Sequence, residues 1–410
     1  MDYVAQTLRD NGFDVQTPEF ERLGTTRGGN PTLTVSGRGY PVDQASLLLT
    51  TPPGGLSAKT LRPQKPAGCS AADYGTAAVS GAIAVVDDAG CSIVDKHDTA
   101  VAEGAVGLLV VSAPGANGSP AGLFTPGYYR QLKVPVGVIG NDANAALRRT
   151  DAPVRLMLDG KAVMVKSRNV LAQTKTGDTR NVVVVGAHLD SVVRSPGMND
   201  SGSGVAAVLE TAAALGSQPQ TTNAVRFAFW GSEEVGLEGS TNYVRGLDRD
   251  QLNDIALYLN FDTLGSPNAG FFTYDGDQSG QPNPNIPVRD VPAGSAGIER
   301  TLAGYLNLAG IRPADLPLAR STDYSAFLAA GVPFGGATTG AAQKKTEVHA
   351  RLWGGRAGVA FDPNHHTPRD TIDNVDRQAL SIMGPAVSFT VGTYGQSTEG
   401  ANGVPPRDGN

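Results

Sequence analysis

Residues 182–210 (VVVVGAHLDSVVRSPGMNDSGSGVAAVLE) hold the side chains with the clearest chemical potential in this chain. A run of valines leads to His188, and Asp190 follows two positions later. Residues two apart along a β-strand point to the same side, so this imidazole and this carboxylate share a face where the strand ends. Asp200 follows in a turn of small residues that opens an amphipathic helix. An imidazole, a carboxylate that orients it and a second carboxylate nearby are the parts of a metal site.

Further metal-type ligands stand at the ends of other predicted strands. Glu233 and Glu234 follow AVRFAFWGS, Asp262 follows LYLNF, and His365 and His366 occur in FDPNHHTPRDT. A single carboxylate at the start of a loop is most often a helix cap or a solvated group. Several in succession favour one shared site, because ligands of open α/β sheets gather outside the carboxyl ends of the strands.

The size of this ligand set points to two metal ions. A catalytic zinc takes three protein ligands and a water, fewer than the set offers. Two ions about 3.5–4 Å apart, sharing one bridging carboxylate and activating a water between them, fit it better. A base that binds no metal is also needed. Glu233 and Glu234 can divide these tasks, because neighbouring loop residues point in different directions. Imidazole and carboxylate ligands would also accept manganese or cobalt.

The elements that must position these residues change along the chain. Residues 30–160 contain short strands separated by turn residues, with one helix expected around 92–103, which is typical of a small β-rich module. His97 lies there without other ligand-type residues, and we expect it to be exposed and structural. From about residue 168, buried strands alternate with helices, which predicts a mostly parallel sheet covered on both faces. Residues 396–410 are polar and Gly/Pro-rich, and predict a disordered tail.

Length and charge narrow the class of protein. The chain has 410 residues, enough for two domains, and a formal net charge of -6, which argues against nucleic acid as a main partner. No apolar run approaches the ~20 residues of a membrane-spanning helix, so we expect no membrane partner. The sequence starts within a predicted helix and shows no signal peptide. We therefore expect an upstream segment, for which an export signal is one candidate.

Cys69 and Cys91 are the two cysteines of the sequence. They are either two unrelated buried thiols, as is usual in a cytosolic protein, or one disulfide that closes the loop between them. Both stand beside glycine-rich turns, and we favour the disulfide, which would indicate an exported protein.

The motifs GAHLDSV, PGMNDSGSG, FWGSEEVGLEGS, LNFDTLGSPNAGFFTYD, KTEVHARLWGGRAGVAFD and HHTPRDT give the chain a family resemblance. Over residues 168–395 it resembles the M28 family of di-zinc metallopeptidases, most of all the secreted Streptomyces-type aminopeptidases. Residues 30–160 resemble a protease-associated (PA) domain. The resemblance implies an α/β/α sandwich of the zinc-peptidase type, built from residues 1–29 and 161–395, with the β-rich PA domain inserted between them.

The resemblance also implies a role for each ligand motif. His188 and Asp262 resemble ligands of one zinc, Glu234 and His366 ligands of the other, Asp200 the bridging carboxylate, Glu233 the general base and Asp190 the carboxylate that orients the first histidine. A cis peptide bond is implied after the bridging aspartate.

The roles of four further residues, His365, Arg320, Asp323 and His349, depend on how far the resemblance extends beyond the ligand motifs. The family's secreted aminopeptidases usually place Tyr or Phe where this chain has His365, and the tyrosine is thought to stabilise an oxyanion. His365 either donates a hydrogen bond there or stands by, and we favour the second. Arg320 and Asp323 match a loop that lines the substrate site in the resembling enzymes, while the alternative is a helix cap beside a solvated arginine. His349 has no such counterpart and reads as a surface-loop histidine.

These features together predict a secreted, monomeric aminopeptidase with two Zn²⁺ per chain, acting on peptides with a free N-terminus. The resemblance implies a preference for large apolar N-terminal residues, and we expect Glu233 and Asp262 to hold the substrate amine. The alternatives are a carboxypeptidase or dipeptidase of the same fold, a glutaminyl cyclase-like transferase, and a non-catalytic PA-bearing receptor. The intact GSEEVG motif counts against the cyclase, and the complete ligand set counts against the receptor.

Overall fold

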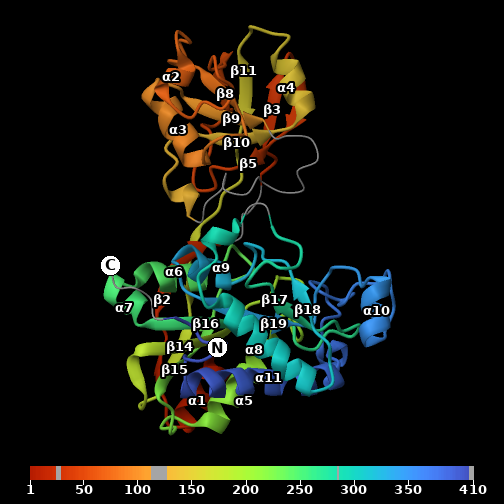
Figure 1. The fold of residues 1–410 in the computed structure, drawn as a ribbon. Helices are drawn as coiled ribbons and strands as arrows, with labels where there is room; N and C mark the ends of the chain where they lie inside the picture. Colours follow the sequence, from red (N-terminus) through yellow and green to blue (C-terminus); the bar gives the residue numbers. More distant parts are fainter. Residues whose placement is uncertain (25–28, 112–126, 284–285, 406–410) are drawn as a thin grey trace. The chain divides into compact units, whose positions relative to one another are not determined.

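We describe a computed structural model of the protein, in which residues 1–24, 29–111, 127–283 and 286–405 are described. The chain folds as two compact units (Figure 1). Unit 1 comprises Met1–Arg22 and Lys166–Asn410, and unit 2 comprises Leu23–Val165. The chain therefore leaves unit 1 after a short N-terminal segment and later returns to it, and the module expected over residues 30–160 lies within unit 2.

A mixed sheet forms the centre of unit 1. Within the described residues its strand order is β1 (Asp14–Gln16), β13 (Val170–Gln173), β15 (Asn223–Trp230), β14 (Asp178–His188), β16 (Ile255–Phe261), β19 (Phe334–Thr338), β17 (Phe272–Tyr274) and β18 (Ala314–Leu316). The middle strands β15, β14, β16 and β19 run parallel, and antiparallel pairs join the outer strands to them. The middle strands are rich in valine and aromatic residues, which suits burial on both faces.

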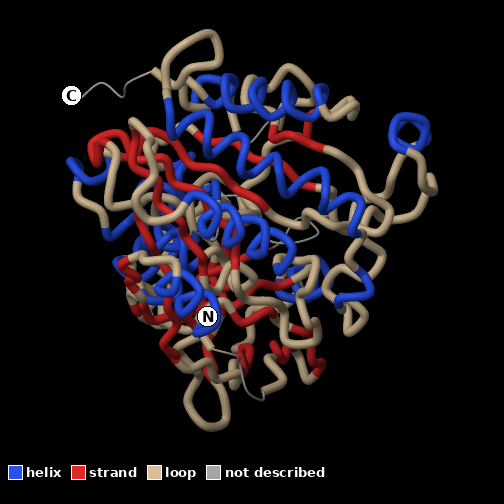
Figure 2. The backbone as a smooth tube through the Cα atoms, turned by 90° about the horizontal axis from the view of Figure 1, so that it is seen from below, coloured by secondary structure: helices blue, strands red, loops and turns tan. Residues whose placement is uncertain are grey.

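Helices cover both faces of this sheet. One side carries α1 (Asp2–Asp10), α5 (Gly202–Leu215), α8 (Ser295–Leu308) and α11 (Arg377–Gln396), and the other α6 (Glu238–Gly246), α7 (Arg249–Asn253) and α9 (Tyr324–Ala329). Val183 and Val185 of β14 enter the first core, whereas Val182 and Val184 enter the second. Alternate residues of one strand thus serve two cores. The predicted α/β/α sandwich is confirmed (Figure 2).

Unit 2 is β-rich in its described part. One sheet has the order β5 (Asp43–Gln44), β10 (Val136–Ile139), β9 (Gly107–Val111), β8 (Ile83–Asp87), β7 (Thr60–Leu61), and the other has β4 (Arg38–Pro41), β3 (Thr32–Val35), β11 (Val154–Met157), β6 (Leu56–Ala58). Its helices are α2 (Ala71–Tyr74), α3 (Ile93–Ala102) and α4 (Asn141–Leu147), with a 3-10 turn η1 at Tyr128–Arg130. The helix expected around residues 92–103 is α3, which begins where Ser92 accepts the N–H of Asp95.

The prediction for His97 is wrong, because its side chain is fully buried. Its Nε2 accepts the main-chain N–H of Lys133 at 2.8 Å and of Val134 at 3.3 Å, and its Nδ1 lies 2.9 Å from the carboxylate of Asp98. The ring therefore ties α3 to the segment before β10. It is structural, as predicted, but it acts from inside the unit.

A disulfide joins Cys69 and Cys91, the favoured of the two alternatives. The buried Lys96 lies beside it and donates from Nζ to the carbonyl oxygens of Ala67 at 2.7 Å and Ala89 at 2.6 Å. The ammonium thereby satisfies main-chain acceptors on both sides of the bridge. The disulfide and the hydrogen bonds of Lys96 therefore stabilise the same part of unit 2.

The predicted tail begins too early. α11 continues to Gln396, and the hydroxyl of Tyr394 donates to the carbonyl of Asn402 at 2.9 Å. Val404 is buried in the first core of unit 1. The prediction of disorder is therefore wrong for residues 397–405, while residues 406–410 lie outside the described residues. None of the helices in the described residues combines the length and apolar character needed to cross a membrane.

Glu299 of α8 lies in an acidic cluster of unit 1. It is 7% exposed, and its Oε2 accepts the N–H of Gly276 at 2.8 Å and of Asp277 at 3.3 Å. Carboxylate oxygens of Asp275, Asp277 and Glu299 lie within 4.8 Å of one another. Burial, reinforced by the charges of the two aspartates, raises the pKa of Glu299 to about 7.

We expect Glu299→Gln to stabilise the protein above neutral pH. A carboxyl pKa raised from 4.5 to about 7 on folding means that ionisation opposes folding. The penalty is absent at low pH, grows as the pH rises between these two values, and reaches about 3 kcal/mol above the upper one. A glutamine oxygen can still accept both N–H groups without carrying charge. Scanning calorimetry should show a higher melting temperature for the variant at pH 8 and a much smaller difference at pH 5.

The matched control is Glu210→Gln, which removes an exposed glutamate from α5. It should melt with the wild type at both pH values. A wild-type protein that is more stable than Glu299→Gln at pH 8 would contradict the prediction.

Candidate metal centre

Parallel strands bring the predicted ligands to one edge of the sheet in unit 1. His188 ends β14 and pairs in register with Trp230, the last residue of β15, while β16 on the other side leads directly into Asp262. The loops that follow these strands therefore meet at the same edge. Asp200 lies in the first of them, immediately before α5, and its peptide bond to Ser201 is cis, as the resemblance implies.

One cluster of ligand atoms surrounds the imidazole of His188. Its Nε2 lies 3.1 Å from Oδ1 of Asp200 and 3.4 Å from Oδ1 of Asp262. Its Nδ1 lies 2.9 Å from the main-chain carbonyl of Asp190, to which it donates in the neutral ring. That hydrogen bond leaves Nε2 as the atom that can bind a cation.

A second cluster surrounds the other oxygen of Asp200. Oδ2 lies 2.8 Å from Nε2 of His365 and 3.0 Å from Nε2 of His366. Nε2 of His366 also lies 3.0 Å from Oε2 of Glu234. The two imidazole rings stack with their centroids 3.8 Å apart. His365 thus lies among the ligand atoms, although the sequence favours a bystander.

The two clusters fit a pair of cations. Asp200 contributes one oxygen to each cluster. Oδ1 of Asp262 and Oε1 of Glu234 are buried and accept no hydrogen bond from the described residues. Such oxygens are costly without a partner, and a bound cation would satisfy both. Imidazole and carboxylate donors in these numbers suit zinc.

The electrostatics of the site favour positive charge. Burial raises the pKa of Glu233 to about 10, with neighbouring carboxylates adding to the shift and His188 opposing it. Burial likewise raises the pKa of Glu234 to about 7. Burial alone would lower the pKa of His188, but Asp262 and Asp200 raise it well above its usual value. The site therefore resists further negative charge and accommodates a cation, whether a metal ion or an ammonium group.

Asp190 acts differently from the expectation. Its carboxylate lies 3.8 Å from Nδ1 of His188, which is too far for a hydrogen bond. Instead its Oδ1 accepts the N–H of Glu233 at 2.9 Å, and its Oδ2 accepts the N–H of Glu234 at 3.2 Å. The side chain of Asp190 therefore fixes the loop after β15, and its main-chain carbonyl orients the histidine.

A buried polar network behind Asp200 is absent from the sequence predictions. Asp370 accepts the N–H of Asn199 at 2.9 Å and the N–H of Asp200 at 3.2 Å. Nδ2 of Asn374, in the 3-10 turn η3 (Ile372–Asn374), donates to Asp370 at 3.1 Å and to Asp362 at 3.0 Å. Because Asp362 begins the loop with both histidines, the network holds that loop in register with Asp200. The acidic residue within HHTPRDT is the signal for it in the sequence.

Asp323 and Arg320 lie in unlike surroundings. Asp323 is 1% exposed, precedes α9 without capping it, and accepts a hydrogen bond from the Ser240 hydroxyl at 2.6 Å. Burial raises the pKa of Asp323 to about 7, and the charges of Asp190 and Asp262 contribute. The helix-cap alternative is therefore wrong for Asp323. Arg320 is exposed.

His349 belongs to the helix α10 (Glu347–Trp353), which corrects the expectation of a surface loop. Its ring stacks on Trp353 with centroids 5.0 Å apart and meets Phe272 edge-on at 5.4 Å. Burial, together with the charge of Lys345, lowers its pKa. His349 therefore packs α10 onto unit 1 and takes no part in the clusters described above.

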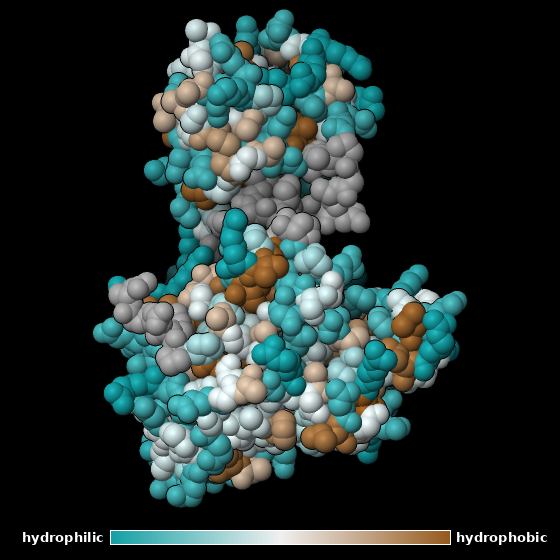
Figure 3. All heavy atoms as spheres, viewed as in Figure 1, coloured by the Kyte–Doolittle hydropathy of each residue, from teal (hydrophilic) through white to brown (hydrophobic). Residues whose placement is uncertain are grey.

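Exposed apolar side chains flank the ligand-bearing loops. Val193 is 95% exposed and Met198 is 43% exposed, and both lie in the loop between β14 and α5. Val235, which is 49% exposed, follows the two glutamates of the loop after β15. Figure 3 shows hydrophobic residues in small groups among hydrophilic ones on the face of unit 1 in view. Apolar contacts are thus available beside the centre.

The sequence matches two family models. A model described as peptidase family M28 matches residues 169–391, and one described as the PA domain matches residues 56–147. The probable lipoprotein aminopeptidase LpqL of Mycobacterium tuberculosis is 47% identical over 99% of this chain and 80% of its own length. An aminopeptidase of Pseudomonas aeruginosa is 36% identical over 97% of this chain and 76% of its own length.

Solved structures share the fold. An aminopeptidase from Aneurinibacillus sp. strain AM-1 superposes with a TM-score of 0.68 at 23% identity, over 99% of this chain and 90% of that chain. BSAP, a zinc aminopeptidase from Bacillus subtilis, superposes with a TM-score of 0.56 at 23% identity, over 98% of this chain and 90% of that chain.

Proposed function

This chain belongs to peptidase family M28 and carries a PA domain, and from that premise we propose that it is a two-zinc aminopeptidase. It hydrolyses the first peptide bond of substrates with a free N-terminus. The single observation that carries this proposal is Asp200, whose two oxygens face two separate groups of ligand-type atoms.

The proposed ligands divide between the two clusters. His188, Asp200 and Asp262 would hold one ion, and Asp200, Glu234 and His366 the other. The orphaned oxygens of Asp262 and Glu234 support this division. When bound, the ions would supply Lewis-acid chemistry, lowering the pKa of a shared water and polarising the substrate carbonyl.

Glu233 is the proposed general base. Its neighbour Glu234 points to His366, and Asp190 holds the main-chain N–H groups of both glutamates. The groups of ligand-type atoms found among the described residues do not include the carboxylate of Glu233. Cations in the centre would favour the ionised form of Glu233, which burial alone disfavours. That carboxylate takes a proton from the attacking water and passes it to the leaving amine.

The excess of carboxylates also fits the substrate's α-ammonium group. The charge of Asp262 helps to raise the pKa values of both Glu233 and Asp323, so a cation beside these carboxylates relieves repulsion. We assign the ammonium to Glu233 and Asp262. The exposed apolar residues of the ligand-bearing loops support a preference for large apolar N-terminal residues, as do relatives named leucine aminopeptidase 2.

We place this activity outside the cytoplasm. The disulfide between Cys69 and Cys91 is typical of an oxidising compartment. A relative named as a lipoprotein aminopeptidase supports the same location.

A substrate panel combined with metal analysis tests the proposal. We expect about two zinc ions per chain by mass spectrometry. We expect hydrolysis of leucine and phenylalanine p-nitroanilides to be about tenfold or more faster than that of the glycine compound, and no hydrolysis of N-acetylated substrates. Release of C-terminal residues would instead identify a carboxypeptidase, and cyclisation of N-terminal glutamine a cyclase. Full metal occupancy without any turnover would identify a binding protein.

A further inference from the structure

We propose that Asn169 is a positioning residue that sets the geometry of the loop 231–239 and, through it, the direction of Glu233. This inference rests on the proposed function, in which Glu233 is the base. The loop has the sequence GSEEVGLEG and runs from the residue after β15 into the first turn of α6. Asn169 lies outside it, immediately before β13.

The side chain of Asn169 joins the two ends of this loop. It is 2% exposed, its Oδ1 accepts the N–H of Gly231 at 3.0 Å, and its Nδ2 donates to the carbonyl of Gly239 at 2.9 Å. Both groups of the amide are used, and both partners are main-chain atoms. Removing the amide would take this acceptor from the N–H of Gly231 and this donor from the carbonyl of Gly239.

The glycines at the loop ends fit this arrangement closely. A Cβ atom on Gly239 would lie 2.2 Å from the carbonyl oxygen of Gly231 and 2.5 Å from Oδ1 of Asn169. A Cβ atom on Gly231 would lie 2.4 Å from the carbonyl oxygen of Arg168. The two ends of the loop therefore lie close to each other and to Asn169, and only glycine permits this approach at either end.

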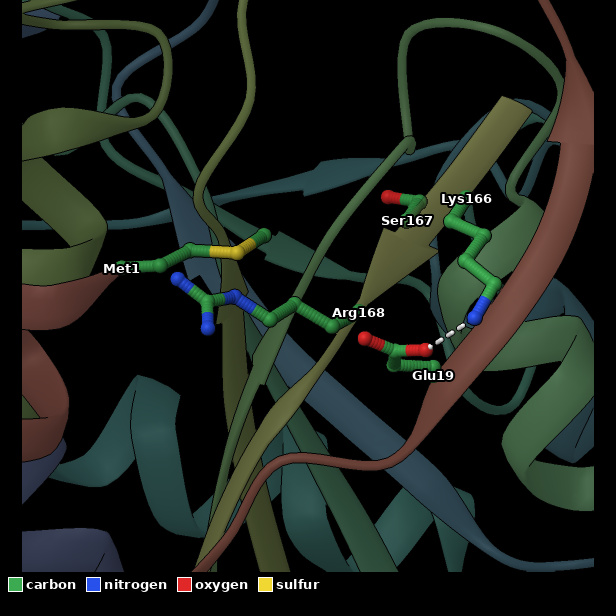
Figure 4. A pocket seen from close by; sticks show the side chains of 5 residues that line it. All are labelled: Met1, Glu19, Lys166, Ser167 and Arg168. Carbon is green, nitrogen blue, oxygen red and sulfur yellow. Dashed lines mark hydrogen bonds and ion pairs between the residues drawn. The ribbon is translucent and has the colours of Figure 1, made fainter.

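Ser167 adds a second contact from the same segment. It lies on β12 (Met164–Arg168), which pairs with β2 (Glu19–Leu23). Its Oγ is 2.8 Å from Oγ of Ser232, a buried residue with a left-handed φ of 66° that directly precedes Glu233. Figure 4 shows Ser167 between Lys166 and Arg168, at the small pocket that these three line with Met1 and Glu19.

The loop is thus held from two sides. Asp190 accepts the N–H groups of Glu233 and Glu234 on one side, and Asn169 and Ser167 hold its ends and its first turn on the other. Losing one of these two sets of contacts would let Glu233 move, although its carboxylate would keep its ability to accept a proton. Misplacing a catalytic group by about 1 Å can cost on the order of 10²-fold in rate.

The test compares Asn169→Ala with Asn223→Ala. Asn223 is also buried, lies at the opposite end of β15, and donates to the carbonyl of Tyr394 at 2.8 Å. With leucine p-nitroanilide and saturating zinc, Asn169→Ala should lower kcat by about 10–100-fold and change KM by less than about twofold. Asn223→Ala should lose similar thermal stability and keep the wild-type kcat. Ser167→Ala should lower kcat by a smaller factor than Asn169→Ala.

Equal kcat values for Asn169→Ala and Asn223→Ala would overturn the inference. If Asn169→Ala does not fold, Asn169→Asp takes its place, since it keeps the acceptor for Gly231 and loses the donor to Gly239, and the same two outcomes decide. A wild-type protein without aminopeptidase activity would refute the proposed function instead. The inference alone fails when the wild type is active and a lesion at Asn169 leaves kcat unchanged.

Discussion

Replacing Glu233 with alanine should lower kcat for leucine p-nitroanilide by about 10²–10⁴-fold, the usual contribution of a general acid–base group. Zinc content should stay at about two ions per chain, because this carboxylate belongs to neither ligand cluster. The main-chain N–H that Asp190 accepts at 2.9 Å remains in the variant, so the loop keeps its anchor. Stopped assays of kcat, with metal analysis of the same preparation, measure both outcomes.

Glu234→Ala is the matched contrast. The two residues are neighbours in one loop, but Oε2 of Glu234 lies 3.0 Å from Nε2 of His366. The other oxygen of Glu234 is buried and accepts no hydrogen bond from the part of the chain that the structure describes. This second variant should lose metal, and excess zinc should restore part of its activity. Activity that survives in Glu233→Ala would show that the base is misassigned. Zinc loss from Glu233→Ala would show that the roles of the two glutamates are exchanged.

Most of the proposed ligands could be predicted from the sequence because they stand at the ends of recognisable strands, whereas His365 and His366 follow no strand directly. His188 ends a run of valines and Asp262 follows LYLNF, so the strand pattern alone places both at the edge of a sheet. The spatial meeting of these ends then follows from the rule for parallel strands. The middle of the sheet obeys that rule, and the outer, antiparallel strands carry no predicted ligand.

The residues that the sequence missed depend on contacts between distant segments. Asp370 holds the N–H of Asn199 across 171 positions, and His97 holds the N–H of Lys133 across 36. His97 lies on the apolar stripe of α3 with Ile93, Val94 and Ala100, but this stripe does not identify its partner. Asp370 stands in no hydrophobic pattern. The buried Asp323 likewise resembles a helix cap in sequence, and only packing of α6 against α9 supplies its partner Ser240. Contacts between distant segments determine the partners of these buried side chains, and the local sequence pattern does not identify those partners.

For Asp190, the sequence predicts the position beside His188 but not the partner of the carboxylate. The spacing to His188 predicts a shared face, and the two residues do lie together. The main-chain carbonyl of Asp190 already satisfies the imidazole, so its carboxylate turns to the two N–H groups of the neighbouring loop. A main-chain partner of this kind is invisible to spacing arguments, because every residue can provide one.

Replacing Asp200 with asparagine should remove at least one zinc ion and lower kcat/KM by about 10³-fold or more, since bound metal supplies several kcal/mol of transition-state stabilisation. Asparagine matches the side chain in size, so the loop can keep its main-chain hydrogen bond to Asp370 at 3.2 Å. It has one acceptor oxygen where aspartate has two, and it carries no charge. It therefore cannot serve both clusters at once. Zinc per chain after dialysis and kcat/KM with added zinc are the measurements.

Asp370→Asn provides the control for this prediction, because it weakens the support of Asp200 and leaves both carboxylate oxygens in place. Loss of such an outer partner typically costs 10–100-fold in metal affinity, so added zinc should restore most of the activity of this variant. Added zinc should restore none in Asp200→Asn, because the deficit there is a missing bridge, which mass action cannot replace. If Asp200→Asn retains both zinc ions after dialysis, then the two ions do not depend on the two oxygens of Asp200, and the shared-carboxylate assignment is wrong.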